Sequence, residues 1–152
     1  MIIIALGTNL GDKENNLHRA IEALGNIGEV LSQSPVYHSE AWGFESENDF
    51  YNMVLTLDTP LTATELLTAT QRIEQELGRT TKSNNAEYSD RVIDIDIIDY
   101  HGTVINDEKL QLPHPLMHQR LFVLEPLRYI APDWQHPLLQ CSATELLQKI
   151  KL

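Results

Sequence analysis

Two aspartates that alternate with isoleucines, Asp94 and Asp96, have the spacing that most directly indicates chemistry. They lie in the segment SDRVIDIDIID, residues 89–99, with an isoleucine on each side of each aspartate. In a β-strand, residues i and i+2 point to the same face, so both carboxylates would lie side by side while the isoleucines enter a core. Carboxylates that close repel one another unless a cation lies between them, so the pattern predicts a metal site. Arg91, three residues before Asp94, favours a nearby anion.

The predicted metal is Mg²⁺, a hard cation that takes oxygen ligands and usually keeps waters and substrate phosphates. Mg²⁺ on phosphate oxygens neutralises charge during phosphoryl transfer. The alternative is a solvent-facing carboxylate pair on an edge strand, and Asp99, which breaks the alternation, is expected to face solvent. His114 and His118 have the i, i+4 spacing of a zinc pair. However, Pro115 lies between them and Cys141 is the only thiol, which does not favour zinc.

Basic and aromatic residues elsewhere suggest an anionic, partly aromatic ligand. An arginine fork binds a phosphate bidentately, and the candidates around a long polar segment are Arg79, Lys82, Arg91 and Arg120. Aromatic faces with an amide between them can hold a flat heterocycle, which singles out Phe50, Asn52 and Phe122. The plainer alternatives, solvated surface cations and core aromatics, stay open for each residue taken alone.

The composition limits the class of protein. The 152 residues fit one domain, 1–152. Eleven basic against 22 acidic residues give a net charge of −11, which argues against nucleic-acid or anionic-membrane surfaces. A single cysteine excludes an internal disulfide. The apolar start lacks a basic leader region, and no run approaches the ~20 apolar residues of a membrane span. We therefore expect a cytoplasmic monomer that acts on small molecules.

The order of predicted elements indicates an α+β fold. We expect strands at 2–6, 28–37, 50–57 and 92–100, a helix at 15–24, and a second helix that begins at a Thr62/Glu65 capping box and ends at Gly78. This β-α-β-β-α-β order is that of a ferredoxin-like sandwich. The turn 7–12, GTNLGD, is expected to be a tight turn or a helix start near an anion, because it matches no Walker motif.

The C-terminal part is predicted to add a hairpin and further helices. Residues 103–105 should pair with 109–111 through a turn at Asn106 and Asp107. A helix over 121–130 should be broken or restarted at Pro126, and Ser142 with Glu145 should cap a last helix. Segments 38–49 and 78–90 fit no element, and connections of that length are often binding loops.

Five ordered segments together resemble one family. They are ALGTNLGD, FYNMV, TQRIEQELGR, DRVIDIDII and LPHPLMHQRLFVLEPL, which cover nearly the whole chain. The chain resembles the 6-hydroxymethyl-7,8-dihydropterin pyrophosphokinases of folate biosynthesis, whose signature of Arg, two spacers and Asp-x-Asp matches Arg91, Asp94 and Asp96. The resemblance implies transfer of the β,γ-diphosphate of ATP to the pterin hydroxymethyl group, with release of AMP.

The resemblance also implies where the substrates and metal ions bind. Two Mg²⁺ ions would be held by Asp94 and Asp96, which with Arg79 and Arg91 form the implied catalytic group. The implied pterin contacts, two aromatic rings and polar groups at the pterin edge, are Thr8, Asn9, Phe50, Asn52 and Phe122. The implied ATP contacts come from two regions. The second helix supplies Gln71 and Glu74, and three residues with nitrogen donors follow it, namely Lys82, His114 and Arg120.

The chain departs from the family pattern just before the aspartate strand. The family often has Arg-Trp-Gly-Pro-Arg there, whereas this chain has EYSDR at residues 87–91. Glu87 and Tyr88 thus replace a basic residue and a tryptophan, and Lys82 would stand in for the lost arginine. The alternative function is a ferredoxin-like ligand-binding or regulatory module without catalysis, which has no need of the Arg91, Asp94 and Asp96 set.

Overall fold

The centre of the protein is an antiparallel sheet. The structure, a computed structural model, describes residues 1–39, 49–78 and 92–151. The strands follow the order β2-β4-β1-β5, with β3 also paired to β4; they are β1 (Ile2–Thr8), β2 (Glu29–Gln33), β3 (Tyr37–Ser39), β4 (Phe50–Asp58) and β5 (Asp94–Tyr100). This order and the helices between the strands confirm the predicted ferredoxin-like α+β fold.

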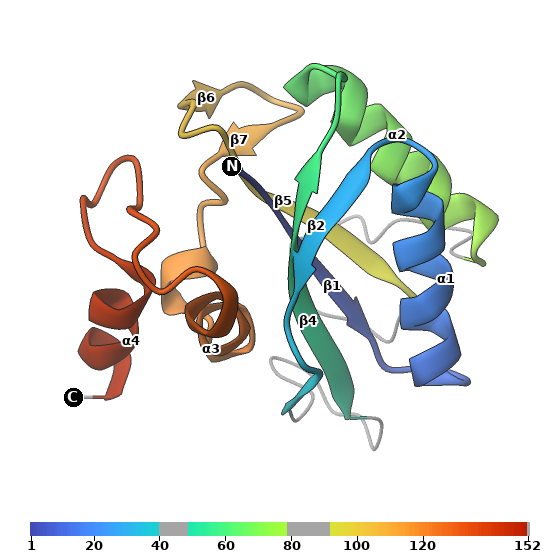
Figure 1. Ribbon diagram of the computed structural model, residues 1–152, viewed down its shortest axis with the longest axis horizontal. Helices are drawn as coiled ribbons and strands as arrows, with labels where there is room; N and C mark the ends of the chain where they lie inside the picture. The colour runs from blue at the N-terminus through green and yellow to red at the C-terminus, as the bar shows by residue number, and fades with distance from the viewer. Residues whose placement is uncertain (40–48, 79–91, 152) are drawn as a thin grey trace.

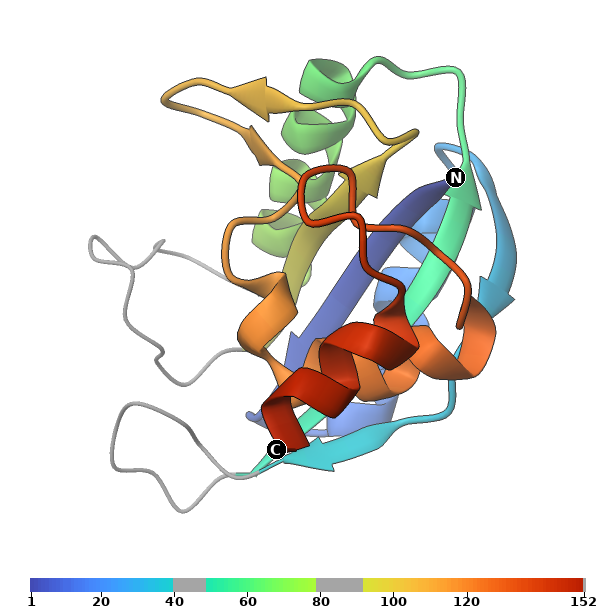
Figure 2. The same cartoon turned by 90° about the vertical axis from the view of Figure 1, so that its left-hand side faces the viewer.

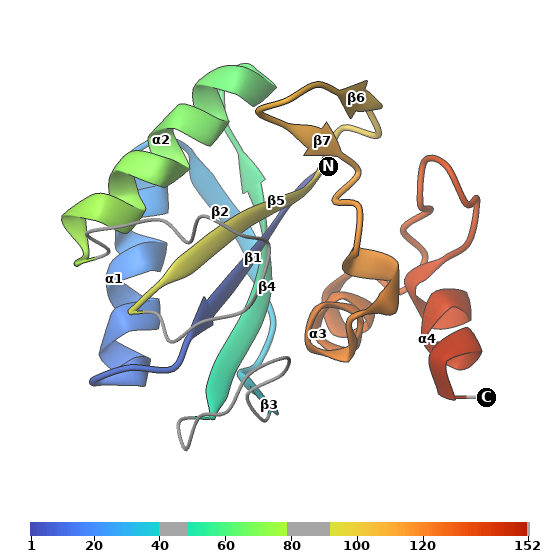
Figure 3. The same cartoon turned by 180° about the vertical axis from the view of Figure 1, so that it is seen from behind.

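Helices cover both faces of this sheet. On one face lie α1 (Lys13–Gly25) and α2 (Ala63–Glu76), and on the other lie α3 (Leu121–Ile130) and α4 (Ala143–Lys151) (Figure 1). Figure 2 looks onto the α3–α4 side, where the short helix η1 (Met117–Gln119) leads into α3. A small hairpin of β6 (Ile105–Asn106) and β7 (Gln111–Leu112) lies beyond the end of β5, beside the start of α2 (Figure 3).

The helices begin where side chains satisfy their first backbone donors. Asp12 accepts a hydrogen bond from the backbone N of Asn15 at 3.1 Å and caps α1. Thr62 and Glu65 form the predicted capping box of α2. Ser142 and Glu145 exchange bonds of 3.0 and 3.1 Å at the start of α4, which confirms that prediction too.

The strands divide their side chains between two cores. Ile2, Ile4 and Leu6 of β1 enter the core under α1 and α2, whereas Ile3 enters the core under α3 and α4. Because successive strand residues point to opposite faces, a strand buried on both sides is almost continuously apolar. This explains the unbroken run of isoleucines at the start of the chain.

Two predicted β elements differ from the structure. The expected strand 28–37 is split into β2 and β3 around Pro35, which has no N–H to give to the ladder. Ser34 bridges the gap, since its N donates to the Val54 carbonyl and its Oγ accepts from the Val54 N. The hairpin is shifted by about one residue: Ile105 pairs with Leu112, and the Asp107 carboxylate accepts from two backbone N–H groups of the turn.

The predictions for Pro126 and Asp99 are wrong. Helix α3 runs unbroken through Pro126, which is buried and whose missing donor costs one helical bond. Asp99 is 2% exposed rather than solvent-facing. A register irregularity between β1 and β5 pairs Ile3 with Asp99 but Ile4 with Ile97, so Asp99 shares a face with the carboxylates of Asp94 and Asp96. The extra strand residue is invisible in the sequence pattern.

No helix within the described ranges is long and apolar enough to cross a membrane.

Candidate active site

A row of four residues crosses the sheet on the face turned away from α1 and α2. Directly paired strand residues point to the same face, and the ladder registers align Tyr37, Asn52, Gly7 and Asp94. Along β5, Asp96 lies on the same face and pairs with Ala5. The expected alternation is confirmed, because both aspartates are half-buried while Ile95 and Ile97 are each 5% exposed in the opposite core.

Gly7 opens a slot in the middle of this row. A Cβ atom placed on Gly7 would lie 2.9 Å from Oδ1 of Asn52 and 3.9 Å from the Phe50 ring. Because Gly7 has no side chain, Oδ1 of Asn52 can lie close over β1, and we call this position over Gly7, between β4 and β5, the slot. Neighbouring strands are about 4.8 Å apart, so the backbones of Asn52 and Asp94 are separated by roughly 10 Å. Gly7 belongs to β1 instead of the predicted turn.

The polar end of the slot is the Asn52 amide. Asn52 is 5% exposed, and its Nδ2 donates to Oγ of Ser39 at 2.8 Å. Phe50 pairs directly with Ser39 and precedes Asn52 by two residues, so its ring lies on the same face. An amide held beside an aromatic ring is the arrangement expected for binding the edge and face of a heterocycle.

The acidic end of the slot is fixed by α2. The Oε2 atom of Glu74, which is 4% exposed, accepts from the backbone N of Ile95 at 2.8 Å. Ile95 lies between Asp94 and Asp96 at the outer edge of the sheet, so this contact anchors the strand between the two carboxylates. Gln71, one turn earlier, is half-buried. The proposed role of these two residues in ATP binding stays a prediction.

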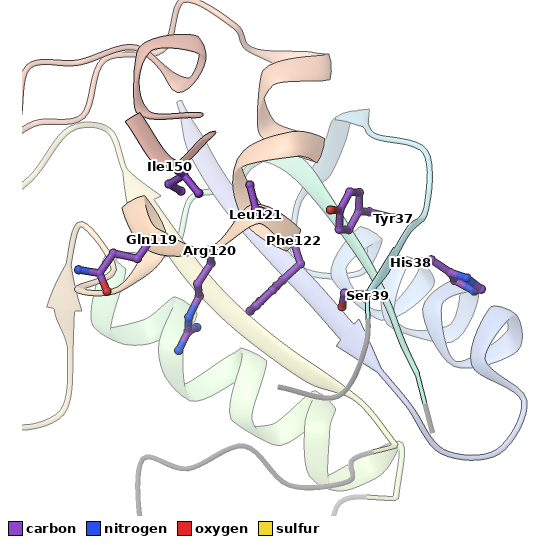
Figure 4. Close-up of a pocket in the computed structure, with 8 residues that line it drawn as sticks. All are labelled: Tyr37, His38, Ser39, Gln119, Arg120, Leu121, Phe122 and Ile150. Atoms are coloured by element: carbon purple, nitrogen blue, oxygen red, sulfur yellow. The ribbon is translucent and has the colours of Figure 1, made fainter. Parts of the chain in front are cut away.

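The loop between β7 and α3 supplies the opposite wall. The backbone N of His114 donates to the Ile98 carbonyl of β5 at 2.9 Å, and Met117 is fully buried in the α3–α4 core. Arg120 and Phe122 extend in the same direction from the η1–α3 junction, away from Ile150 (Figure 4). The Arg120 guanidinium carbon lies 5.6 Å from the Phe122 ring centre, a cation–π contact.

A cavity of about 440 Å³ lies between this loop, β3 and α4. Its lining includes Arg120 and Phe122, which were predicted from the sequence, and it also includes Tyr37, His38, Ser39, Gln119, Leu121 and Ile150 (Figure 4). The cavity therefore joins the loop side chains to the β3 end of the sheet row.

His114 is held in its neutral form. Its pKa is lowered from 6.5 to about 4, mainly by burial and also by the Arg120 guanidinium, while the Asp94 carboxylate partly opposes both effects. Nδ1 of His114 accepts from the backbone N of Leu116 at 3.2 Å. In the neutral ring the proton therefore resides on Nε2, which is available as a donor.

Thr8 and Asn9, which are predicted to contact the pterin edge, are both fully buried at the end of β1. Thr8 pairs with Tyr51 and lies on the opposite sheet face from Gly7. Its Oγ1 donates to the Val92 carbonyl and accepts from Nδ2 of Asn16 at 3.2 Å, which ties the end of β1 to the start of β5. Asn9 is fully buried beside it. Arg79, Lys82 and Arg91 lie outside the described residues.

Comparison with known proteins decides the family. A family model described as 7,8-dihydro-6-hydroxymethylpterin-pyrophosphokinase (HPPK) matches residues 3–132. The chain belongs to this family. A 2-amino-4-hydroxy-6-hydroxymethyldihydropteridine pyrophosphokinase of Porphyromonas gingivalis is 46% identical over 90% of this chain and 94% of its own length. A Bacillus subtilis protein of the same description is 40% identical over 84% of this chain and 75% of its own length.

Solved structures show the same fold. The HPPK-DHPS protein of Plasmodium falciparum, determined with pteroate, has a TM-score of 0.77 at 13% identity over 97% of this chain. The match spans 44% of that longer chain. The likeness therefore concerns the HPPK fold.

The two strand carboxylates have the chemistry of a site for a hard cation such as Mg²⁺. Among the described residues, no group of three or more His, Cys, Asp or Glu side chains gathers as a metal cage. Two half-buried carboxylates on one face are instead what Mg²⁺ uses when substrate phosphates complete its shell.

Sequence reasoning missed three members of the site, Gly7, Tyr37 and Ser39. The sequence pattern puts Gly7 in a turn, ends the second strand at Tyr37 and leaves Ser39 in the segment 38–49, which fits no predicted element. The pairing of Tyr37 with Asn52 is a long-range register, for which the local sequence carries no signal.

Proposed function

We propose that this chain catalyses the HPPK reaction, the transfer of diphosphate from ATP to 6-hydroxymethyl-7,8-dihydropterin with release of AMP. Family membership supports this proposal, and one observation in the structure carries it. That observation is the row from Asn52 across the Gly7 slot to Asp94, in which an amide and a carboxylate share one face of the sheet, and this arrangement supports binding of a heterocycle beside a cation.

The pterin lies over the slot with its polar edge at Asn52. Phe50 and Phe122 stack on its two faces, and the hydroxymethyl group points along the row toward Asp94 and Asp96. The separation of roughly 10 Å between the two ends suits a bicyclic ring with a one-carbon substituent. Stacking and edge recognition hold the alcohol in place, which removes orientational freedom before the reaction.

The triphosphate lies between β5 and the loop that precedes α3. Arg120 and the Nε2–H group of neutral His114 donate to phosphate oxygens, and Arg79, Lys82 and Arg91 add positive charge. Glu74 and Gln71 contact the nucleotide side. Donors already in place stabilise the charge that develops at the transferred group, since they do not have to reorganise during the reaction.

Asp94 and Asp96 would hold two Mg²⁺ ions, which would supply positive charge that neutralises the phosphate oxygens during transfer. The pterin hydroxyl oxygen attacks the β-phosphorus in line and loses its proton to solvent, while the bond from the β-phosphorus to the oxygen shared with the α-phosphorus breaks and AMP leaves. No covalent intermediate with the protein is required, and Cys141 has no role. His114 does not act as a base, because its Nδ1 lone pair is occupied by the Leu116 N–H and its Nε2 carries the proton.

We further propose that residues 1–152 form one domain that acts as a cytoplasmic monomer on these small molecules and does not bind nucleic acid. The acidic net charge of −11 supports the last point.

AMP formation tests the proposed function. The protein is incubated with ATP, Mg²⁺ and hydroxymethyldihydropterin, and AMP and the pterin diphosphate are measured together. Equal amounts of both products, none without Mg²⁺ and none without pterin, are expected. Well-folded protein that binds the pterin but releases no AMP would favour the non-catalytic binding module instead.

A further inference from the structure

The Asn52 amide is oriented by a side chain that lies outside the row itself. Ser39 lies on β3, where it pairs directly with Phe50, so it is diagonal to Asn52 in the ladder. Despite this offset, Nδ2 of Asn52 reaches Oγ of Ser39 at 2.8 Å. Oδ1, the other end of the amide, lies 2.9 Å from the position of a Cβ on Gly7. The amide plane therefore runs from β3 to the slot.

We propose that Ser39 is a positioning residue for pterin binding, which acts by fixing the plane of the Asn52 amide over the Gly7 slot. This inference rests on the proposed function, because it assumes that the pterin edge binds to Asn52.

The physical basis is the softness of the terminal amide torsion. The last torsion of an asparagine has broad, roughly two-fold minima, so an amide without a fixed partner samples many orientations. A ligand that binds such an amide must order it, which weakens binding. The Ser39 hydroxyl provides the ordering contact before the ligand arrives, and half-burial of Ser39 limits competition from water.

A structural role alone does not explain this contact. Residues Tyr37 and Ser39 already pair with β4 through the backbone, so the strand does not need the side-chain bond to form. The sheet also contains a comparable side-chain hydrogen bond between two strands that lies away from the site. Ser32 on β2 shares a hydrogen bond of 2.6 Å with Thr56 on β4, four residues beyond Asn52.

The test compares Ser39→Ala with Ser32→Ala as a matched control. Binding of 6-hydroxymethyl-7,8-dihydropterin is measured by calorimetry in the presence of a non-hydrolysable ATP analogue, and steady-state kinetics give KM and kcat. Loss of a net hydrogen-bond contribution predicts that Ser39→Ala weakens pterin binding about fivefold and raises the pterin KM similarly. The kcat and the affinity for the ATP analogue should change less than about twofold, as should every parameter of Ser32→Ala.

Rescue and coupling separate positioning from general damage. Ser39→Thr keeps the hydroxyl and should bind pterin within about twofold of the wild type. Asn52→Ala should weaken pterin binding by about ten- to a hundredfold, and adding Ser39→Ala to it should have no further effect, since Ser39 acts through Asn52. Thermal unfolding of each variant shows whether the fold is retained.

The outcomes distinguish this inference from the proposed function. If Asn52→Ala weakens pterin binding but Ser39→Ala does not, the positioning role is wrong and the proposed function stands. An additive loss in the double variant, or an equal loss in Ser32→Ala, also overturns the positioning role. Unchanged pterin binding in Asn52→Ala would overturn the placement of the pterin, and the role of Ser39 with it.

Discussion

The two halves of the site are held by different kinds of structure. The sheet half, with Gly7, Asn52 and Asp94, is positioned by continuous ladders, in which β1 pairs with β4 through seven residue pairs from Ile2 to Thr8. The loop half, with His114 and Arg120, lies in the segment between β7 and α3, outside the strand ladders of the large sheet. Its anchors are one backbone bond to β5, the buried Met117 and packing against the C-terminal segment.

This difference predicts that the two halves of the site have different roles. Positions set by a ladder cannot shift without breaking several backbone bonds, so the sheet half is suited to groups that must hold a fixed geometry. A loop with few anchors can adjust at lower cost, since local stability follows local contact density. Under the proposed function, the residues for the pterin edge and the metal ions belong to the sheet half, and the cationic residues for the flexible triphosphate belong to the loop half.

The largest expected effect comes from the sheet half. Asp96→Asn keeps the shape of the side chain but removes its charge, so it should lower kcat by about a hundredfold or more through loss of metal-bound charge stabilisation. Pterin affinity should change little, because the slot is intact. Rapid-quench measurement of AMP formation gives the rate, and calorimetry with pterin gives the affinity. Asp133→Ala, at an exposed position, is the control, and wild-type turnover in Asp96→Asn would refute the metal role.

Acid should weaken the loop half first. The folded-state pKa of His114 is about 4, against its ordinary value of 6.5, so between these values the unfolded chain binds a proton that the folded chain does not. The contribution to stability is complete above pH 6.5 and is lost as the pH falls toward 4. The loss amounts to at most about 3 kcal/mol in the free energy of unfolding.

Comparison of the wild type with His114→Gln separates the titration of His114 from that of the carboxylates, because the variant keeps the carboxylates and lacks the imidazole. Urea unfolding of both proteins from pH 7.5 to 4 should show the wild type losing stability faster than the variant below pH 6.5. Hydrogen exchange should show that protection falls in residues 113–120 before it falls in β1 and β4. Parallel pH profiles for the two proteins would mean that His114 is not buried in its neutral form.

Gly7→Ala should damage the sheet half without unfolding it. The atom nearest the new Cβ, at 2.9 Å, is the movable Oδ1 of Asn52, so the amide rotates away instead of the strand shifting. Pterin affinity should fall about tenfold while the melting temperature stays near that of the wild type, since alanine suits a strand better than glycine. Gly25→Ala, where nothing lies within 4 Å of the new Cβ, is the matched control and should leave affinity unchanged.

Local patterns in the sequence predicted the parts of the site that depend on a single strand or helix. The alternation around Asp94 and Asp96 follows from the two-residue period of a strand, and the capping residues Thr62 and Glu65 lie three apart in the same turn. These patterns need no knowledge of distant residues. The fold class followed from the order of such elements.

The sequence could not predict features that depend on register between distant strands. Asp99 follows two isoleucines, and only the pairing of Ile3 with Asp99 reveals that the bulge places its side chain beneath the C-terminal segment. Ser39 and Tyr37 likewise join the site through their pairing with β4 after the break at Pro35. The assignments of Arg79, Lys82 and Arg91 stay predictions, because these residues lie outside the described ranges.

The smallest expected effect concerns the support of the loop half by the C-terminal segment. Nε1 of Trp134 donates to Oδ2 of the buried Asp99 at 2.9 Å, and His136 packs against both the Trp134 and His118 rings at 5.8 and 6.0 Å. His118 belongs to η1, so these contacts join the segment after α3 to the loop that carries His114 and Arg120. Burial lowers the pKa of His136, which favours the uncharged ring in this packing.

Trp134→Phe should therefore loosen the loop half and leave the sheet half intact. The substitution removes the donor to Asp99 and should lower the free energy of unfolding by about 1 kcal/mol, measured by urea denaturation. Hydrogen exchange should rise in η1, while pterin affinity, which depends on the sheet row, stays within about twofold of the wild type. Tyr129→Phe, which changes a side chain that is 71% exposed, controls for a general effect of aromatic substitution on this layer. Equal loosening of β4 and η1 in Trp134→Phe would show that the two halves unfold as one unit, because the loop would then have no stability of its own to lose.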